Sequence, residues 1–357
     1  MTIHGRGAAE NPPNRFETIR YEANPEDSLS PYQGWEGEEA GPAPATQFLR
    51  DTSRSIIAYN DSPDVGFEAS INPYRGCEHG CIYCYARPTH EYLGFSSGLD
   101  FETKILVKED APELLRRELA SPRWQPQTIA ISGVTDCYQP AERHFQLTRR
   151  CLEVLAEFRN PVGIVTKSHL VVRDADLLTE LARFEAAGVF LSITTLDAEL
   201  AGLMEPRATR PAGRLAAIET LHKAGIPVGV MVAPVIPGLN DHEIPAIVAA
   251  VAQAGAGFAG FTMLRLPFAI KDLFESWLGR HFPEKRDKIL SRIRAVRSGK
   301  LNDPRFRSRM KGEGIIAETI ADMFKLACQK AGVRGRGPKL STAAFRRPGG
   351  EQRQLFE

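Results

Sequence analysis

The sequence of 357 residues predicts an α/β fold built on parallel strands. Six short apolar runs follow one another from Phe67 onward, and strands of a parallel sheet are typically apolar on both faces. Amphipathic stretches separate these runs. The alternation of strand and helix predicts a partial (β/α)6, TIM-like barrel over residues 67–266.

The expected strands and helices can be placed in chain order. The strands are FEASINPY, QTIAISGV, PVGIVTKS, GVFLSITTLD, PVGVMVAPV and GFAGFTML. The helices between them cover 140–158, 173–187, 211–224 and 241–254. Several of these helical stretches open with Pro or Asp, which are typical of a helix N-terminus.

An N-terminal arm, residues 1–66, precedes the barrel. It holds seven prolines and little hydrophobic periodicity, and its five arginines face eleven acidic residues, a net charge of −6. We expect this arm to be mostly irregular, because such a composition buries little apolar surface.

A basic helical extension, residues 267–331, follows the barrel. Residues 265–311 contain fourteen Lys or Arg against five Asp or Glu, a local net charge of +9. The acidic arm balances this charge, so the whole chain carries a formal net charge of only +1. The last segment, 332–357, is rich in Gly and Arg and is predicted to be a flexible tail.

Composition excludes several classes of protein. Hydrophobic residues make up 43% of the chain and charged residues 25%, which is typical of a globular protein. The N-terminus has no apolar signal segment, and no run approaches the roughly 18 apolar residues of a membrane span. We therefore expect a cytoplasmic protein with no membrane partner.

Three of the six cysteines, Cys77, Cys81 and Cys84, lie within eight positions in a loop that leaves the first strand. Soft thiolates at this spacing can converge on one soft metal site. A structural zinc ion needs four ligands, and His79 would have to fold back within a tight loop to be the fourth. An ordinary iron–sulfur cluster also takes four cysteines, so three would leave one iron open to an outside ligand, which implies catalysis.

The segment NPYRGCEHGCIYCYAR resembles the radical S-adenosylmethionine (SAM) superfamily. The resemblance implies a [4Fe–4S] cluster and S-adenosylmethionine as cofactors, and a 5′-deoxyadenosyl radical that abstracts hydrogen from a substrate. It also implies an electron donor such as flavodoxin or ferredoxin. With SGVTDCYQPAE and PVIPGLND, the chain is most similar to the group that contains spore photoproduct lyase and relatives labelled DNA-repair photolyases.

The end of the second strand holds Ser132, Gly133, Thr135 and Asp136, where the superfamily receives the methionine amino group. The glycine permits close approach of a ligand to the backbone, and Thr135 and Asp136 offer acceptors for an ammonium group. The alternative is a strand end followed by a helix cap, with Asp136 as a turn residue.

Further cofactor contacts are implied by the resemblance. Lys167, Tyr85 and Ser192 would contact the cofactor carboxylate, and Tyr83 would pack near the adenine. Thr194, on the same strand as Ser192, belongs to the same expected set. Arg207 would neutralise the carboxylate or brace the neighbouring Glu205. Without the resemblance, Lys167 would be a solvated lysine, Ser192 a strand hydroxyl and Tyr83 a core residue.

Cys137 is the candidate catalytic thiol. Spore photoproduct lyase uses a cysteine three residues before the aspartate of this motif as a hydrogen donor, and Gly133 occupies that position here. Cys137 directly follows Asp136, so it is either a displaced hydrogen donor or a small packed hydrophobe. The departure argues against thymine-dimer reversal as the activity.

Two segments suggest macromolecular partners. The basic residues of 285–311 are suited to a DNA or other nucleic-acid backbone, or else form a solvated helix face or pair with the acidic arm. Gln352, Leu355 and Phe356 resemble the Gln-x-x-Leu-Phe peptide by which DNA-repair proteins bind the sliding clamp. Three functions stay open: a radical enzyme acting on nucleic acid, one acting on a protein or metabolite, and a non-catalytic metal-binding adaptor.

Overall fold

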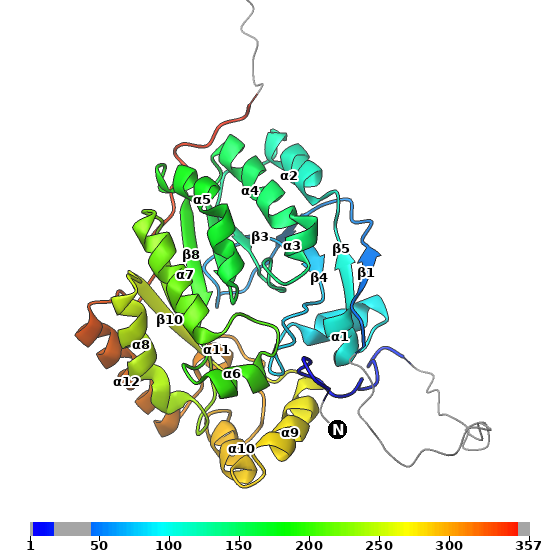
Figure 1. The fold of residues 1–357 in the computed structure, drawn as a ribbon, viewed down its shortest axis with the longest axis vertical. Coiled ribbons are helices and arrows are strands. Elements are labelled where there is room, and N and C mark those ends of the chain that lie inside the picture. The colour runs from blue at the N-terminus through cyan, green and yellow to red at the C-terminus, as the bar shows by residue number, and fades with distance from the viewer. Residues whose placement is uncertain (1–2, 18–43, 349–357) are drawn as a thin grey trace, which may run out of the picture.

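The computed structural model describes residues 3–17 and 44–348, and its elements alternate as the sequence predicts (Figure 1). Gln352, Leu355 and Phe356, the predicted clamp-binding residues, lie outside the described residues. No helix within the described ranges is long and apolar enough to cross a membrane.

A seven-stranded sheet forms the barrel wall, in the order β10-β9-β8-β7-β6-β3-β2. Its parallel strands are β3 (Ala69–Ile71), β6 (Ile129–Ile131), β7 (Val162–Thr166), β8 (Ala187–Ser192), β9 (Val228–Val235) and β10 (Phe258–Met263). They coincide with the six predicted strands, and β3 and β6 are buried at every position. β10 and β2 end this sheet in the described chain, so the barrel is partial, as predicted.

Helices cover the outer face of this sheet (Figure 1). They are α2 (Ala111–Ala120), α4 (Leu147–Phe158), α5 (Ala175–Ala182), α7 (Pro211–Lys223) and α8 (Ile244–Gln253). In α4 the buried residues Leu147, Cys151, Leu155 and Phe158 recur every three or four positions, so one stripe of the helix faces the sheet. Cys151 is therefore a core residue.

The connections and the extension hold the remaining helices. Those in the connections are η1 (Arg87–Leu93), α1 (Leu99–Thr103), α3 (Glu142–Phe145), η2 (His169–Asp174), α6 (Ala198–Met204) and η3 (Asp241–Glu243). The extension contains α9 (Ile270–His281), α10 (Arg286–Ala295), α11 (Ser308–Lys311) and α12 (Ile315–Ala331). The helical character predicted for 267–331 is thus seen in the structure, and α12 packs on α8.

The N-terminal arm contains more regular structure than the sequence indicates. Its β1 (Gln47–Arg50) pairs in parallel with β5 (Lys104–Val107), and its β2 (Ile57–Tyr59) pairs antiparallel with β3. β4 (Tyr74–Arg75) completes the small sheet β1-β5-β4. The partner strands come from later in the chain, so the arm's own composition does not reveal these pairings.

The segment after α12 also differs from the predicted flexible tail, over residues 333–348. Arg334 forms a β-bridge with Phe258, and the Ser341 N–H donates to the Glu185 carbonyl at 2.9 Å. The Phe345 ring packs against Phe158 of α4 with ring centroids 6.3 Å apart. Backbone pairing and one aromatic contact therefore anchor a segment that lacks periodicity of its own.

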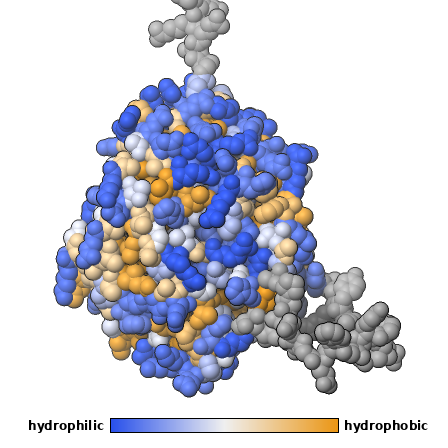
Figure 2. Space-filling view, in the orientation of Figure 1, coloured by the Kyte–Doolittle hydropathy of each residue, from blue (hydrophilic) through white to orange (hydrophobic). Residues whose placement is uncertain are grey.

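The molecular surface is mostly polar on the face drawn in Figure 2, particularly over α2, α4 and α5. Apolar residues on this face gather over α7 and α8. Ala246 and Ala249 of α8 are exposed. Small aliphatic side chains of this kind are common on protein surfaces and indicate no site by themselves.

Candidate active site

The cysteines lie in the loop of residues 77–84, between β4 and η1, which we call the cluster loop. Gly80 adopts a left-handed φ of +67°, and a Cβ there would lie 2.7 Å from a carboxylate oxygen of Glu102. Gly7 packs from the other side, so close that a Cβ on it would collide with the Gly80 carbonyl. Glycine is therefore required at both positions, because the loop is clamped between the N-terminal segment and α1.

The three thiols of the cluster loop lie near one another. Cys77 and Cys81 are buried, and Cys84 is half-buried. Burial raises the pKa of each of the three thiols, and the nearby Asp136 carboxylate raises the pKa of Cys77 further. Three thiolates in this place need positive charge to compensate them, which the irons of a cluster supply.

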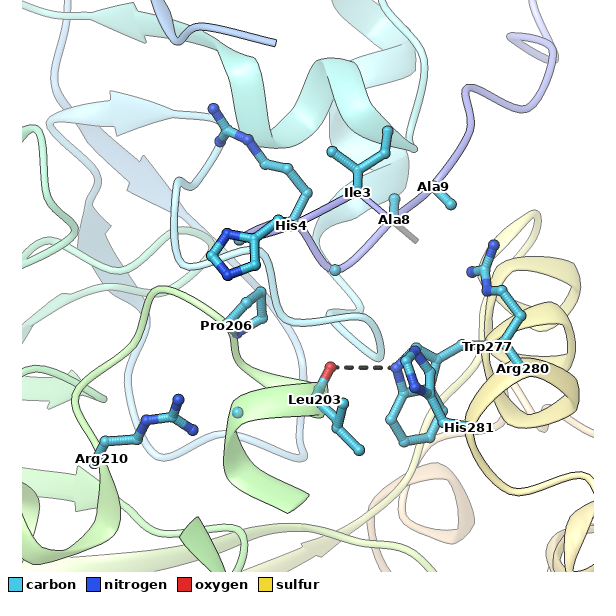
Figure 3. Close-up of a pocket in the computed structure, with 14 residues that line it drawn as sticks. Ile3, His4, Ala8, Ala9, Leu203, Pro206, Arg210, Trp277, Arg280 and His281 are labelled. Carbon is cyan, nitrogen blue, oxygen red and sulfur yellow. Dashed lines mark hydrogen bonds between the residues drawn. The ribbon is translucent and has the colours of Figure 1, made fainter. Parts of the chain in front are cut away.

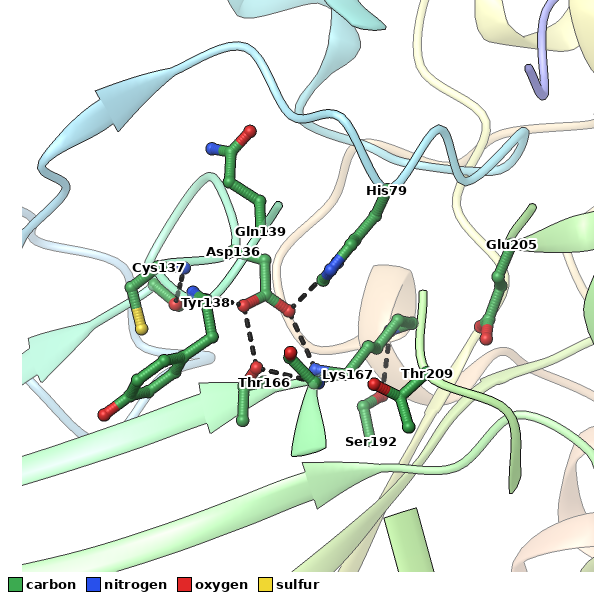
Figure 4. A network of polar contacts seen from close by, with 12 residues as sticks. His79, Asp136, Cys137, Tyr138, Gln139, Thr166, Lys167, Ser192, Glu205 and Thr209 are labelled. Carbon is green, nitrogen blue, oxygen red and sulfur yellow. Dashed lines mark hydrogen bonds and ion pairs between the residues drawn. The ribbon is translucent and has the colours of Figure 1, made fainter. Parts of the chain in front are cut away.

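His79, the alternative fourth ligand, points toward another partner. Its side chain is buried, with Nδ1 3.4 Å from Oδ2 of Asp136 (Figure 4). Among the described residues no three His, Cys, Asp or Glu side chains are gathered as around a single ion. A [4Fe–4S] cluster takes one cysteine at each of three irons, so the residues present fit such a cluster with Cys77, Cys81 and Cys84 as ligands.

A buried ion pair between Arg87 and Glu102 supports the cluster loop. The Arg87 guanidinium donates to the carbonyls of Cys81 at 3.0 Å and Gly80 at 3.2 Å. The Glu102 carboxylate accepts the N–H groups of Gly7 at 3.0 Å and Ala8 at 2.8 Å. Both side chains are completely buried, so this pair joins the loop, α1 and the N-terminal segment.

Asp136 connects three parts of the site (Figure 4). Its carboxylate accepts the Thr166 hydroxyl and the Lys167 N–H, each at 2.7 Å, and pairs with His79. Burial alone would raise the pKa of Asp136, but the His79 imidazole and these hydrogen bonds lower it to about 2. The carboxylate is thus committed to holding the end of β7 against the cluster loop.

Thr135 is committed in the same way. Its hydroxyl donates to the Tyr74 carbonyl at 2.8 Å, and its side chain is buried. From the sequence we expect the side chains of Thr135 and Asp136 to receive an ammonium group. In the structure both side chains instead form hydrogen bonds with other residues of the protein. Ser132 has a left-handed φ of +77°, and its Oγ accepts the Cys137 N–H at 2.8 Å. Gly133 offers its carbonyl to the Tyr85 hydroxyl at 2.9 Å.

Lys167 and Ser192 meet at the carboxyl ends of β7 and β8. The Lys167 Nζ donates to the Ser192 Oγ at 2.9 Å and lies 5.8 Å from the centroid of the Tyr83 ring. The charge of Lys167 also acts on Cys81 and Cys84. The structure thus brings together the cluster loop and three of the predicted cofactor residues.

A second buried network lies behind these residues. Glu205 accepts hydrogen bonds from the Tyr83 hydroxyl, the Thr194 hydroxyl and the Arg214 guanidinium. Burial alone would raise the pKa of Glu205, but the Arg214 and Lys167 charges lower it to about 2. Tyr83 and Thr194 are therefore fixed against β8 by an ionised carboxylate.

Arg207 occupies a different place from the one predicted. Its guanidinium pairs with Glu78 at 3.0 Å and donates to Thr46 at 3.3 Å. Arg214, on α7, is the residue that braces Glu205. Arg207 and Glu205 are two residues apart in sequence, which suggested that they would pair. In the structure Arg207 pairs with Glu78 and Glu205 pairs with Arg214.

Cys137 is packed in the core. It is 1% exposed and belongs to the main hydrophobic cluster with residues such as Tyr138 and Leu152. Burial raises the pKa of its thiol well above the usual range. Of the two alternatives for this residue, the structure therefore favours the packed hydrophobe.

Sequence reasoning did not find Arg87, Glu102 or Arg214, and it considered His79 only as a metal ligand. Arg87 lies three residues after the third cysteine, and this position was the only sequence feature that could have linked it to the cluster loop. Glu102 and Arg214 act on residues far away in sequence, and nothing in their local pattern distinguishes them from surface charges.

A separate cavity of about 340 Å³ lies between the N-terminal segment, α6 and α9 (Figure 3). Arg6, Arg210 and Arg280 line it together with His4 and His281, and Trp277 donates to the Leu203 carbonyl at its wall. None of the predicted cofactor residues lines this cavity. It is therefore distinct from the site at the strand ends.

The structure combines a partial parallel barrel with three neighbouring thiols at its carboxyl end. The family model described as the Radical SAM superfamily matches residues 71–251. An uncharacterised protein of Mycobacterium tuberculosis is 38% identical over 292 residues, 79% of this chain and 84% of the relative. An uncharacterised protein of Methanocaldococcus jannaschii is 30% identical, over 63% of this chain and 80% of the relative. The chain belongs to the radical SAM superfamily.

Solved structures show the same fold. Spore photoproduct lyase complexed with dinucleoside spore photoproduct has a TM-score of 0.58 at 16% identity, over 79% of each chain. A doubly substituted variant of that lyase, with AdoMet and the dinucleoside photoproduct bound, has a TM-score of 0.56 at 17% identity, over 79% of this chain and 78% of the lyase. At these identities the likeness concerns the fold, and it confirms the predicted partial barrel.

We predict that Glu102→Gln lowers the free energy of unfolding by roughly 3–5 kcal/mol, the cost of leaving one charge of a buried pair uncompensated. Chemical denaturation monitored by circular dichroism measures the change. Glu219→Gln is the control, because Glu219 pairs with Lys223 on the exposed face of α7. Equal stability of the Glu102→Gln variant and the parent would contradict the role given to this pair.

Proposed function

We propose that the protein is a radical SAM enzyme that holds a [4Fe–4S] cluster on Cys77, Cys81 and Cys84 and acts on a nucleic acid. The observation that carries the proposal is the group of three thiols, two buried and one half-buried, near the Lys167 ammonium at the carboxyl end of the barrel. When bound, the reduced cluster supplies the electron that cleaves S-adenosylmethionine to a 5′-deoxyadenosyl radical.

Lys167 supplies positive charge for the cofactor carboxylate. Its described contacts are the Ser192 hydroxyl and the Tyr83 ring, and no carboxylate of the described chain is within ion-pair distance of its Nζ. Ser192 in turn donates to the Ala233 carbonyl at 3.1 Å, which fixes the hydroxyl that positions the ammonium. A cation held in place without an anionic partner is suited to an anionic ligand.

Backbone groups near Ser132 and Gly133 take the part expected of the Thr135 and Asp136 side chains. Thr135 and Asp136 shape the loop through their bonds to Tyr74, Thr166 and Lys167. Ser132 has a left-handed φ and Gly133 has no side chain, so a ligand can approach the backbone of this loop closely, and a backbone carbonyl there would accept from the methionine ammonium. The Tyr85 hydroxyl donates to the Gly133 carbonyl, which connects this loop to the residue that follows the cluster loop.

The nucleic-acid part of the proposal draws on two observations. Spore photoproduct lyase, which shares the fold, is solved with a dinucleoside photoproduct. The extension of this chain carries the basic residues of 285–311. Cys137 is buried and Gly133 stands where the lyase group has its donor thiol, so we propose a nucleic-acid substrate other than the spore photoproduct.

Many charges of the basic extension already have protein partners. Arg286 and Arg294 lie 3.7 and 3.8 Å from Glu275, and Arg292 lies 3.9 Å from Asp241. Arg297 is buried and donates to the Leu264 carbonyl at 2.6 Å. The net charge of the segment therefore overstates what it offers to a phosphate backbone, and other parts of the molecule must contribute to binding.

Two protein partners complete the proposal. An electron donor such as flavodoxin or ferredoxin would reduce the cluster. A sliding clamp would bind the C-terminal residues Gln352, Leu355 and Phe356 and raise the local concentration of the enzyme on DNA.

Anaerobically reconstituted protein should carry about four irons per chain, the content of one cluster, and should release 5′-deoxyadenosine from S-adenosylmethionine under dithionite. Cys81→Ala should lose both properties, because a three-cysteine site has no spare ligand. Cys328→Ala, which changes a core cysteine of α12, is the matched control and should keep both. Zinc retained at one ion per chain, without iron uptake, would refute the cluster and favour a metal-binding adaptor.

Lys167→Met should weaken S-adenosylmethionine binding by about 1.5–3 kcal/mol, the range for a hydrogen bond to a charged group. Isothermal titration of the reconstituted protein measures the change. Lys325→Met, at an exposed position of α12, is the control and should bind as the parent does. Unchanged affinity in the Lys167→Met variant would remove this lysine from the cofactor site.

A further inference from the structure

Five exposed aromatic side chains each lie against an arginine. Each is between 47% and 71% exposed; they are Phe16, Tyr85, Tyr92, Phe268 and Phe306, and we call them the aromatic rim. Tyr85 directly follows the cluster loop, and Phe268 lies in the connection from β10 to α9. Large exposed aromatic groups that gather in one region mark binding surfaces more often than isolated ones do.

Arg15 joins three of these rings. Its guanidinium carbon lies 3.7 Å from the centroid of Phe268, 4.8 Å from that of Phe16 and 5.4 Å from that of Tyr92. The Phe16 and Tyr92 rings are themselves 4.8 Å apart, and Arg15 is anchored by Glu91 at 2.6 Å. Cation–π contacts thus hold together rings from three separate segments of the chain.

Phe268 has a backbone conformation that is unfavourable for its side chain. Its φ is +51°, in the left-handed region, where a bulky residue is strained. The ring is nevertheless 56% exposed, so burial does not compensate the strain. Strained residues of this kind cluster at ligand-binding positions, where a fixed orientation of the side chain is needed.

Two further arginines extend the rim toward the active site. The guanidinium carbon of Arg265 lies 5.0 Å from the centroid of the Tyr85 ring, and that of Arg309 lies 4.4 Å from the centroid of the Phe306 ring. The Tyr85 hydroxyl in turn contacts Gly133, in the loop proposed to receive the cofactor. Arg265 and Phe268 lie in the same connection after β10, so this connection carries a member of each group.

We propose that the aromatic rim binds unpaired nucleotides, with bases stacked on Phe268 and Phe306 and phosphates near Arg265. The inference rests on the nucleic-acid function proposed above and narrows it to single-stranded or locally unpaired substrates. Aromatic rings interleaved with arginines bind single strands because every base has a π-face, whereas the bases of an intact duplex are already stacked on one another. Hydrogen abstraction from a base or sugar requires the same exposure of the nucleotide.

Fluorescence anisotropy of the reconstituted full-length protein tests the proposal with a labelled oligothymidylate of about 15 nucleotides, the span of one single-strand site, and a duplex of the same length. We expect the single strand to bind at least about tenfold more tightly than the duplex at equal salt. Phe268→Gly and Phe306→Ala should each weaken single-strand binding by roughly tenfold, the scale of one lost base stack. Phe268→Trp should bind at least as tightly as the parent.

The Phe268→Gly variant separates binding from folding, because glycine accepts a left-handed φ and the relief of strain offsets the lost contact with Arg15, so its melting temperature should stay close to that of the parent. Leu326→Ala is the matched control, since Leu326 is 51% exposed on α12, away from the rim. Equal affinity of Phe268→Gly and the parent would overturn the inference. So would a preference for the duplex, or tight binding of a poly(Glu,Tyr) peptide in place of the oligonucleotide.

The cofactor-cleavage and oligonucleotide-binding assays together distinguish an error in the rim inference from an error in the proposed function. If the parent forms 5′-deoxyadenosine and binds duplex DNA but not the single strand, the nucleic-acid function stands and the rim inference is wrong. If it binds neither nucleic acid, both the rim inference and the nucleic-acid substrate are wrong, while radical SAM chemistry stands. If no 5′-deoxyadenosine forms, the proposed chemistry fails whatever the oligonucleotide does.

Discussion

The buried Arg87–Glu102 ion pair is the interaction on which the geometry of the cluster loop depends. Both charges are removed from water, which is costly unless every polar group finds a partner. Arg87 finds loop carbonyls and Glu102 finds N-terminal N–H groups, so the pair is stable only when the loop, α1 and the N-terminal segment are assembled together. The glycines at positions 7 and 80 follow from this packing, because a side chain at either would separate the layers.

The same principle recurs around the cofactor site. The largely buried carboxylate of Asp136 and the fully buried one of Glu205 keep pKa values near 2 against the effect of burial, because His79 and Arg214 compensate their charges. Each carboxylate accepts hydrogen bonds from residues of separate segments and so holds those segments together at the carboxyl end of the barrel. The ammonium of Lys167 also acts on Glu205, but among the described residues its Nζ donates to the Ser192 hydroxyl and forms no ion pair with a carboxylate. The proposed function assigns this charge to the cofactor carboxylate.

The sequence was sufficient for the parts of the structure that depend on local pattern. Apolar runs identified the six parallel strands, and the segment with the three clustered cysteines identified the superfamily whose model matches the chain. It was insufficient where a residue acts through a distant partner. Thr135 and Asp136 have the right chemistry for an ammonium ligand, but Tyr74, Thr166 and His79 occupy them. Arg207 is nearer to Glu205 in sequence than Arg214 is, yet the turn after α6 brings Arg214 to that carboxylate.

The proposed function requires that Cys77, Cys81 and Cys84 hold a [4Fe–4S] cluster that binds S-adenosylmethionine. Electron paramagnetic resonance of the dithionite-reduced, reconstituted protein measures this binding at the cluster itself. We predict the signal of a reduced [4Fe–4S] cluster whose g-values shift when S-adenosylmethionine is added. A cluster signal that is identical with and without S-adenosylmethionine would contradict the account.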